Sequence, residues 1–114
     1  LVMGDRGIKF ENFVALSLLK HALGKADSSG NDFTVQYLRA KDGKEVDFAA
    51  VESGKISRLI EVKLSDGTVS KNLKYFSDKY HLKGLQVVKE LKREKSVDGL
   101  DIVSADSYLK SLFL

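Results

Sequence analysis

The sequence predicts a single α/β domain in which helices flank one mixed sheet. An apolar stripe with helical spacing opens the chain, three strand-like segments joined by turn signals follow it, and a second helical stripe separates these strands from further apolar segments. Helices and strands combined in this way pack as layers around one sheet. The chain has 114 residues, the size of one domain, so we expect residues 1–114 to form a single unit. The abrupt start "LVMGDRG" leads us to expect a piece of a longer protein.

The first helix is predicted over residues 7–23, because apolar residues such as Val14 and Leu18 recur there at spacings of three and four. A polar loop follows it. The turn signals "KDGK" and "SGK" then separate short segments rich in strand-forming residues. Tight turns join antiparallel neighbours, so these segments predict a three-stranded meander. The expected strands cover residues 33–40, 44–52 and 56–65.

The second half of the chain predicts helices and strands in alternation. A helix is expected over residues 66–80, where Leu73 and Phe76 share one helical face and lysines occupy the others. A last helix is expected to begin at a cap formed by Ser104 or Asp106. The order is therefore α-β-β-β-α-β, followed by β-α. The remaining segments are a strand at 85–88, a charged and exposed stretch at 89–99, a strand at 100–104 and a helix at 105–114.

Composition limits the kinds of site that the chain can carry. It contains no cysteine, which excludes disulfides and thiolate metal sites and fits a cytoplasmic protein. His21 and His81 lack metal-binding spacing, so a hard cation with oxygen ligands is the supported kind of metal site. No apolar run approaches the roughly 20 residues that span a bilayer, so we expect no membrane partner. The net charge of +3 permits a nucleic-acid partner without requiring one.

Three charged residues interrupt the predicted second and third strands: Asp47, Glu61 and Lys63. Side chains alternate along a strand, so Glu61 and Lys63 share one face, about 6–7 Å apart. Asp47 is expected on the face of the second strand opposite Val46 and Phe48. The turn lies midway between Asp47 and Glu61, so the hairpin can bring the two carboxylates to matching heights. We therefore expect two carboxylates and an ammonium group to converge.

A fourth charged residue, Glu11, falls on the apolar stripe of the first helix, three residues before Val14 and seven before Leu18. A carboxylate is unfavourable there unless it is paired or bound to a ligand. Two simpler interpretations stay open. Glu11 can be a helix-end carboxylate favoured by the helix dipole, and a Glu-x-Lys pair is common on solvated faces of sheets.

Carboxylates on a rigid sheet beside an ammonium group favour metal-assisted hydrolysis of phosphodiester bonds. Carboxylate oxygens hold Mg²⁺ in near-octahedral geometry and leave positions for water and phosphate. The ion acidifies a bound water and polarises phosphoryl oxygens. The ammonium group orients the water or offsets charge that grows on the phosphate. The expected cofactor is therefore Mg²⁺ or Mn²⁺.

The order of these residues resembles that of the PD-(D/E)XK nuclease superfamily, whose restriction-endonuclease-like core is α-β-β-β-α-β. In that family an Asp lies on the second core strand and a Glu-x-Lys on the third, which match Asp47 and "EVK", Glu61 to Lys63. The subset that includes archaeal Holliday-junction resolvases adds a Glu on the first helix, which matches Glu11. The resemblance implies metal ligation by Glu11, Asp47 and Glu61 and catalysis by Asp47, Glu61 and Lys63. The family's proline before the Asp is replaced by Val46.

A narrower resemblance covers residues 7–88. The segments "GIKFENFVALSLLK", "YLRAKDGKEVDFAAVESGKISRLIEVKLSD" and "LKYFSDKY" look like the domain found C-terminal to AAA-type ATPases in bacteria and archaea. The likeness implies an N-terminal ATPase domain in the parent chain, since no P-loop occurs in the 114 residues. In that group the nuclease-like domain often looks like an appendage. The alternative function is therefore a catalytically silent module that binds nucleic acid or docks on the ATPase.

DNA is the expected partner if the domain is a nuclease. Arg39, Lys41 and Lys44 lie near the predicted site in the sequence and are expected to contact the phosphate backbone. Arg39 also has an alternative partner in Glu45. Resolvase-like enzymes act as dimers, so the resemblance also makes a homodimer an expectation.

Overall fold

The computed structural model describes residues 9–18, 20–21, 33–39, 43–65 and 68–113. The first element among these residues is an N-terminal helix, which covers residues 9–18 and 20–21. In the described part of the chain, six strands and two further helices follow it. In chain order they are β1 (Phe33–Arg39), β2 (Glu45–Glu52), β3 (Lys55–Ser65), α2 (Lys71–Tyr80), β4 (Gly84–Glu90), β5 (Lys95–Val97), β6 (Leu100–Ser104) and α3 (Ala105–Phe113).

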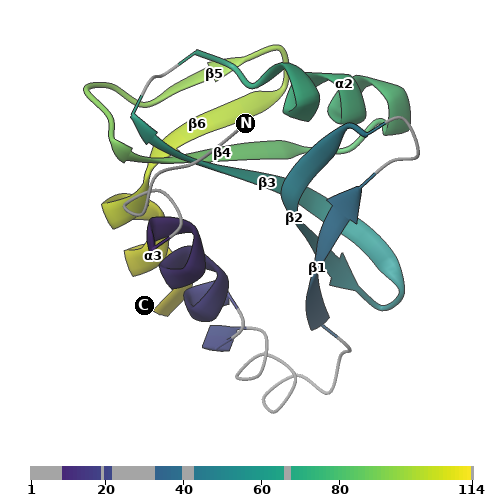
Figure 1. Ribbon diagram of the computed structural model, residues 1–114, viewed down its shortest axis with the longest axis horizontal. Coiled ribbons are helices and arrows are strands. Elements are labelled where there is room, and N and C mark those ends of the chain that lie inside the picture. Colours follow the sequence, from purple (N-terminus) through teal and green to yellow (C-terminus); the bar gives the residue numbers. More distant parts are fainter. Residues whose placement is uncertain (1–8, 19, 22–32, 40–42, 66–67, 114) are drawn as a thin grey trace.

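The six strands form one mixed sheet with the order β1-β2-β3-β4-β6-β5 (Figure 1). The first three strands are antiparallel neighbours, as predicted for the meander. The chain then crosses over through α2, so that β4 runs parallel to β3 and β6 runs parallel to β4. The predicted α/β class, the mixed sheet and the α-β-β-β-α-β order of the first six elements are therefore confirmed, whereas one more strand than predicted follows them.

Two tight turns fix the hairpins of this sheet. Ser53 and Gly54, between β2 and β3, have φ angles of 53° and 79°, and Asp98 and Gly99, between β5 and β6, have φ angles of 51° and 81°. Positive φ at both central residues is the type I′ geometry that matches strand twist. The second turn belongs to a strand that was not predicted, because β5 lies inside the stretch expected to be charged and exposed. With three mostly polar residues, β5 is too short to show an alternating pattern in the sequence. Its pairing with β6 is what defines it as a strand.

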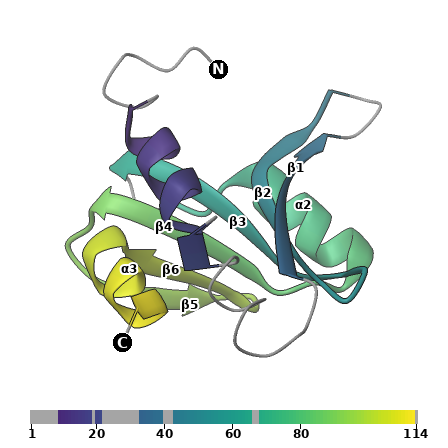
Figure 2. The same ribbon diagram turned by 90° about the horizontal axis from the view of Figure 1, so that it is seen from below.

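The helices cover opposite faces of the sheet (Figures 1 and 2). The N-terminal helix and α3 pack on one face, and α2 packs on the other. Each face buries its own apolar cluster. The first includes Phe10, Val14, Leu18, Phe48, Ile60, Val62, Leu85 and Val87, and the second includes Val46, Ala49, Leu59, Leu73, Phe76 and Leu100.

Side-chain caps define where α2 and α3 begin. Ser70 caps α2 by accepting the Leu73 N–H, so this helix begins later than the predicted residue 66. Ser104 Oγ accepts the Ser107 N–H at 3.2 Å, which makes Ser104, of the two predicted candidates, the cap of α3. Among the described residues, no helix combines the length and the apolar character needed to cross a bilayer.

A bulge in β2 changes the predicted face of one residue. Tyr37 of β1 lies opposite two residues of β2, Asp47 and Phe48, because the register shifts there. Val46 consequently packs on the α2 face, whereas Phe48 packs beneath the N-terminal helix. The prediction that Val46 and Phe48 share a face is therefore wrong. Strand alternation assumes a regular ladder, and the extra residue interrupts it beside Asp47.

Candidate active site

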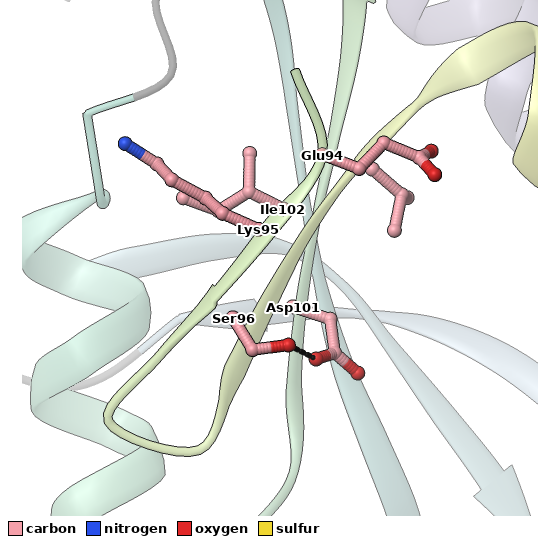
Figure 3. Close-up of a pocket in the computed structure, with 6 residues that line it drawn as sticks. Glu94, Lys95, Ser96, Asp101 and Ile102 are labelled. Carbon is pink, nitrogen blue, oxygen red and sulfur yellow. Dashed lines mark hydrogen bonds between the residues drawn. The ribbon is translucent and has the colours of Figure 1, made fainter.

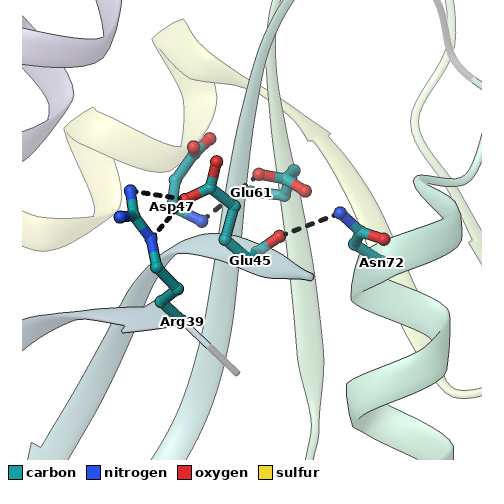
Figure 4. Close-up of polar contacts among 5 residues, drawn as sticks. All are labelled: Arg39, Glu45, Asp47, Glu61 and Asn72. Atoms are coloured by element: carbon teal, nitrogen blue, oxygen red, sulfur yellow. Dashed lines mark hydrogen bonds and ion pairs between the residues drawn. The ribbon is translucent and has the colours of Figure 1, made fainter. Parts of the chain in front are cut away.

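Asp47 and Glu61 meet where the regular pairing of β2 with β3 ends. Backbone pairing between β2 and β3 extends as far as Phe48 and Ile60. Beyond this pair, backbone N–H groups donate to side-chain carboxylates and not to backbone carbonyls. The Val62 N–H donates to Asp47 Oδ2 at 2.8 Å, and the Asp47 N–H donates to Glu61 Oε1 at 3.3 Å. Figure 4 shows the two acidic residues side by side on neighbouring strands. The convergence predicted for these two carboxylates is present.

The environment of the pair disfavours two negative charges. Burial raises the pKa of Asp47 to about 8, and the hydrogen bond to Glu61 and the charge of Glu61 act in the same direction. The Val62 N–H opposes them by favouring the ionised form. Without a cation, this environment therefore favours the protonated form of Asp47. A strongly shifted carboxyl group beside a second carboxylate is typical of functional sites and of cation sites.

Glu11 approaches Asp47 from the N-terminal helix. Burial raises the pKa of Glu11, and the charges of Asp47 and Glu45 raise it further. These carboxylates are therefore close enough to interact. Within the described part of the chain, however, no three His, Cys, Asp or Glu side chains are grouped closely enough to hold a metal as they stand. Joint ligation of one ion by Glu11, Asp47 and Glu61 stays a prediction.

Lys63 lies two residues after Glu61 on β3, so the two side chains leave the strand on the same face. Its side chain is half-buried, and its backbone pairs with Val88 of β4. Among the described residues, the Lys63 ammonium group forms no hydrogen bond or ion pair. Convergence of this ammonium group with the two carboxylates stays a prediction.

The predicted nucleic-acid contacts are engaged elsewhere in the structure. Arg39 contacts Glu45 Oε2 through Nη2 at 2.9 Å and Nε at 3.0 Å (Figure 4). The Lys44 Nζ lies 3.9 Å from the centre of the Tyr75 ring. Lys41 falls outside the described residues. Of the two partners weighed for Arg39, the structure has Glu45, and contact of Arg39 and Lys44 with nucleic acid stays a prediction.

Two residues at this site were absent from the sequence prediction: Ser70 and Gln86. Ser70 Oγ donates to Glu61 Oε2 at 2.9 Å, and Gln86 Oε1 accepts the Ser70 N–H at 2.9 Å. Gln86 is 0% exposed. The available signals were a lone amide inside the apolar run "GLQVV" and a serine directly before a helical stripe. Neither the amide nor the serine reveals in the sequence which carboxylate it contacts, directly or through a neighbour.

A shallow pocket of about 300 Å³ lies at the other edge of the sheet, between β5 and β6 (Figure 3). Three of its polar side chains bind one another or the backbone: Ser96 Oγ donates to Asp101 Oδ1 at 2.6 Å, and Glu94 Oε2 accepts the Ser104 N–H at 2.8 Å. These contacts secure the short edge strand. The carboxylate pair, and not this pocket, is the chemically distinctive feature of the domain.

Comparison with known proteins gives one match. Residues 6–108 match the family model described as "Domain of unknown function (DUF4143)". No curated protein and no solved structure matches the chain significantly. The match covers most of the 114 residues. The chain therefore belongs to the DUF4143 family, a domain known from AAA-ATPase-associated contexts.

Proposed function

We propose that this domain is a metal-dependent nuclease of the PD-(D/E)XK type that hydrolyses phosphodiester bonds of DNA. The observation that carries the proposal is the half-buried pair Asp47 and Glu61, in which each carboxylate accepts a backbone amide of the other's strand at the end of the β2–β3 ladder. A fold gains little stability from two adjacent carboxylates that oppose each other's ionisation. Such a pair is explained by a cation that compensates both charges.

The chemistry of the donor set fits Mg²⁺ or Mn²⁺. Asp47 and Glu61 supply carboxylate oxygens on two adjacent strands, and Glu11 supplies a third carboxylate within electrostatic reach. Hard divalent cations take oxygen ligands of this kind and keep several waters. When bound, the ion would acidify a water and stabilise charge on the phosphate.

The residues of the chain would then have separate roles. Asp47 and Glu61 would hold the cation, and their bonds to backbone amides keep the carboxylates in place. The ammonium group of Lys63, which has no hydrogen bond or ion pair among the described residues, leaves β3 on the same face as Glu61. It donates hydrogen bonds to the attacking water or to a phosphate oxygen. The order Asp, then Glu-x-Lys, agrees with the PD-(D/E)XK resemblance of the sequence.

The test is cleavage of branched, single-stranded and duplex DNA in Mg²⁺ or Mn²⁺. We expect at least one substrate to be cut, and Asp47→Ala and Lys63→Ala to remove the activity. Asp101→Asn is the matched control, because this exposed carboxylate lies on β6 and bonds to Ser96. Absence of cleavage on all three substrates, or equal cleavage by Asp47→Ala and Asp101→Asn, would rule the proposal out.

A second candidate function is a catalytically silent module that binds nucleic acid or docks on an ATPase partner. Two observations favour it: the family is known from AAA-ATPase-associated contexts, and no three-residue metal group is formed among the described residues. Calorimetric titration with Mn²⁺ separates the two candidates. A nuclease binds Mn²⁺ in a way that Glu61→Gln abolishes, whereas a silent module gives no heat that depends on Glu61.

A further inference from the structure

Gln86 is a fully buried amide in the centre of the sheet. It is 0% exposed, and its strand neighbours Leu85 and Val87 point into the apolar cluster on the opposite face. It is paired in parallel register with Glu61 of β3. Directly paired residues project from the same face of a sheet, so both side chains lie on the α2 side. A buried amide is unfavourable unless its hydrogen-bonding groups have partners.

The loop that enters α2 provides those partners. Gln86 Oε1 accepts the Ser70 N–H at 2.9 Å, and Gln86 Nε2 donates to the Thr68 carbonyl at 2.8 Å. One partner is a donor and the other an acceptor, so the amide can adopt only one orientation. Gln86 therefore fixes the backbone of this loop at two points, two residues apart.

Fixing the loop also fixes the Ser70 hydroxyl. Its oxygen accepts the Leu73 N–H at 3.3 Å, as an N-cap does, and it donates its hydrogen to Glu61 Oε2 at 2.9 Å. The other Glu61 oxygen, Oε1, accepts the Asp47 N–H. Each oxygen of the Glu61 carboxylate thus has a separate donor, which determines the rotation of the group.

We propose that Ser70 and Gln86 are positioning residues that hold the Glu61 carboxylate in the orientation required to bind a divalent cation. The inference rests on the proposed function and deepens it, because it names the residues that orient Glu61, one of the proposed metal ligands. An N-cap requires only an acceptor for the helix amides. The hydrogen that Ser70 directs to Glu61 is an additional feature, and partners of this kind typically change metal affinity by 10–100-fold.

The experiment measures Mn²⁺ affinity by calorimetry, with no DNA present. Ser70→Gly keeps an acceptable cap but removes the donor to Glu61, and Ser70→Thr retains both functions. We expect about a 10–100-fold weaker Kd for Ser70→Gly and a change within about threefold for Ser70→Thr. The matched control is Ser77→Ala. Ser77 is as buried as Ser70, at 8% exposure, lies on the same helix, and bonds the Leu82 carbonyl away from the site.

Gln86→Met provides a second and independent variant. Methionine has a similar length and no hydrogen-bonding amide, so the Ser70 N–H and the Thr68 carbonyl lose their partner. We expect weaker Mn²⁺ binding here too, again by about tenfold or more. This variant decides the question if Ser70→Gly does not fold, and Ser70→Gly decides it if Gln86→Met does not.

The outcomes separate this inference from the proposed function. Wild-type affinity in Ser70→Gly and Gln86→Met, with binding abolished in Glu61→Gln, would overturn the positioning role and leave the proposed function standing. If Ser77→Ala weakens Mn²⁺ binding by the same factor, the loss of affinity comes from a less stable helix. That result would also overturn the positioning role. A wild-type domain that binds no Mn²⁺ contradicts the proposed function, and the positioning role fails with it.

Discussion

The hairpin of β2 and β3 has two ends that differ in how their polar groups are satisfied. At the turn end, Ser53 and Gly54 adopt the positive φ angles of a type I′ turn, and backbone pairing begins beside them and continues across one register shift between Ala50 and Val51. At the open end, the ladder stops and the carboxylates of Asp47 and Glu61 accept backbone amides instead. Both ends belong to the same two strands. The difference between them therefore lies in local chemistry and not in fold.

The two ends of the hairpin affect the stability of the domain in opposite ways. The turn end uses the backbone geometry that strand twist favours. The open end holds two half-buried acidic groups, and burial together with the hydrogen bond and charge of Glu61 raises the pKa of Asp47. Sites that bind or catalyse often lower stability in this way. We therefore expect changes at the open end to affect activity, and changes at the turn end to affect stability.

The largest expected effect is on cleavage by Lys63→Met. Removal of the ammonium group beside Glu61 should slow cleavage by about 10²–10⁴-fold, the range typical of a group that assists proton transfer. Lys55→Met is the control, because Lys55 is an exposed lysine of the same strand at the turn end. Single-turnover rates with Mn²⁺ provide the measurement. Equal rates for the two variants would remove the functional distinction between the two ends.

The next effect is a gain of stability in Asp47→Asn, measured by urea unfolding without metal. The folded domain keeps the Asp47 proton from pH 3.8 to about 8, whereas the unfolded chain releases it above pH 3.8, so wild-type stability falls as pH rises through this range. Asparagine carries no charge and removes this loss.

Solvent screening limits the gain to about 1–2 kcal/mol near pH 8.5. The advantage should shrink as the pH falls towards 4. A variant that is less stable than wild type near pH 8.5 would show that the open end does not oppose folding.

A smaller loss is expected for Gly54→Ala at the turn end. Gly54 has a φ of 79°, and a Cβ added there meets no atom within 4 Å. The cost therefore comes from backbone conformation alone, about 1 kcal/mol. Gly54→Asn should lose less, because asparagine tolerates positive φ. Chemical denaturation measures the change, and the Mn²⁺ affinity should be that of the wild type. A change in that affinity would show that the two ends are coupled.

The smallest effect concerns the exposed ion pair of Arg39 and Glu45. Side-chain exposure of 78% and 56% limits its contribution to at most about 0.5 kcal/mol, so Arg39→Ala should barely change stability. The DNA affinity of the Arg39→Ala variant is more informative than its stability. If Arg39 leaves Glu45 to contact a phosphate, the variant should bind DNA more weakly, and the dependence of log affinity on log salt should decrease by about one. An unchanged salt dependence would remove Arg39 from the predicted interface.

Much of the fold was accessible to sequence reasoning, because it depends on local periodicity and turn chemistry. The Ser53–Gly54 turn and the strands on either side of it were predicted from neighbouring residues alone. The short strand β5 was not, since three polar residues form a strand only when β6 provides a partner. Val46 was placed on the wrong face for a related reason. A bulge is a property of two paired strands, and one strand's sequence does not reveal it.

The sequence by itself determined which chemical groups are available: the acidic residues Glu11, Asp47 and Glu61, the ammonium group of Lys63, and the strand and helix spacing that carries them. Tertiary structure decided how these groups meet. The end of the β2–β3 ladder brings Asp47 against Glu61, and the crossover through α2 places Ser70 and Gln86, 16 residues apart, behind the Glu61 carboxylate. Spacing along one element is a local property. Contacts between elements depend on register and crossover, which are set only when the whole sheet is assembled.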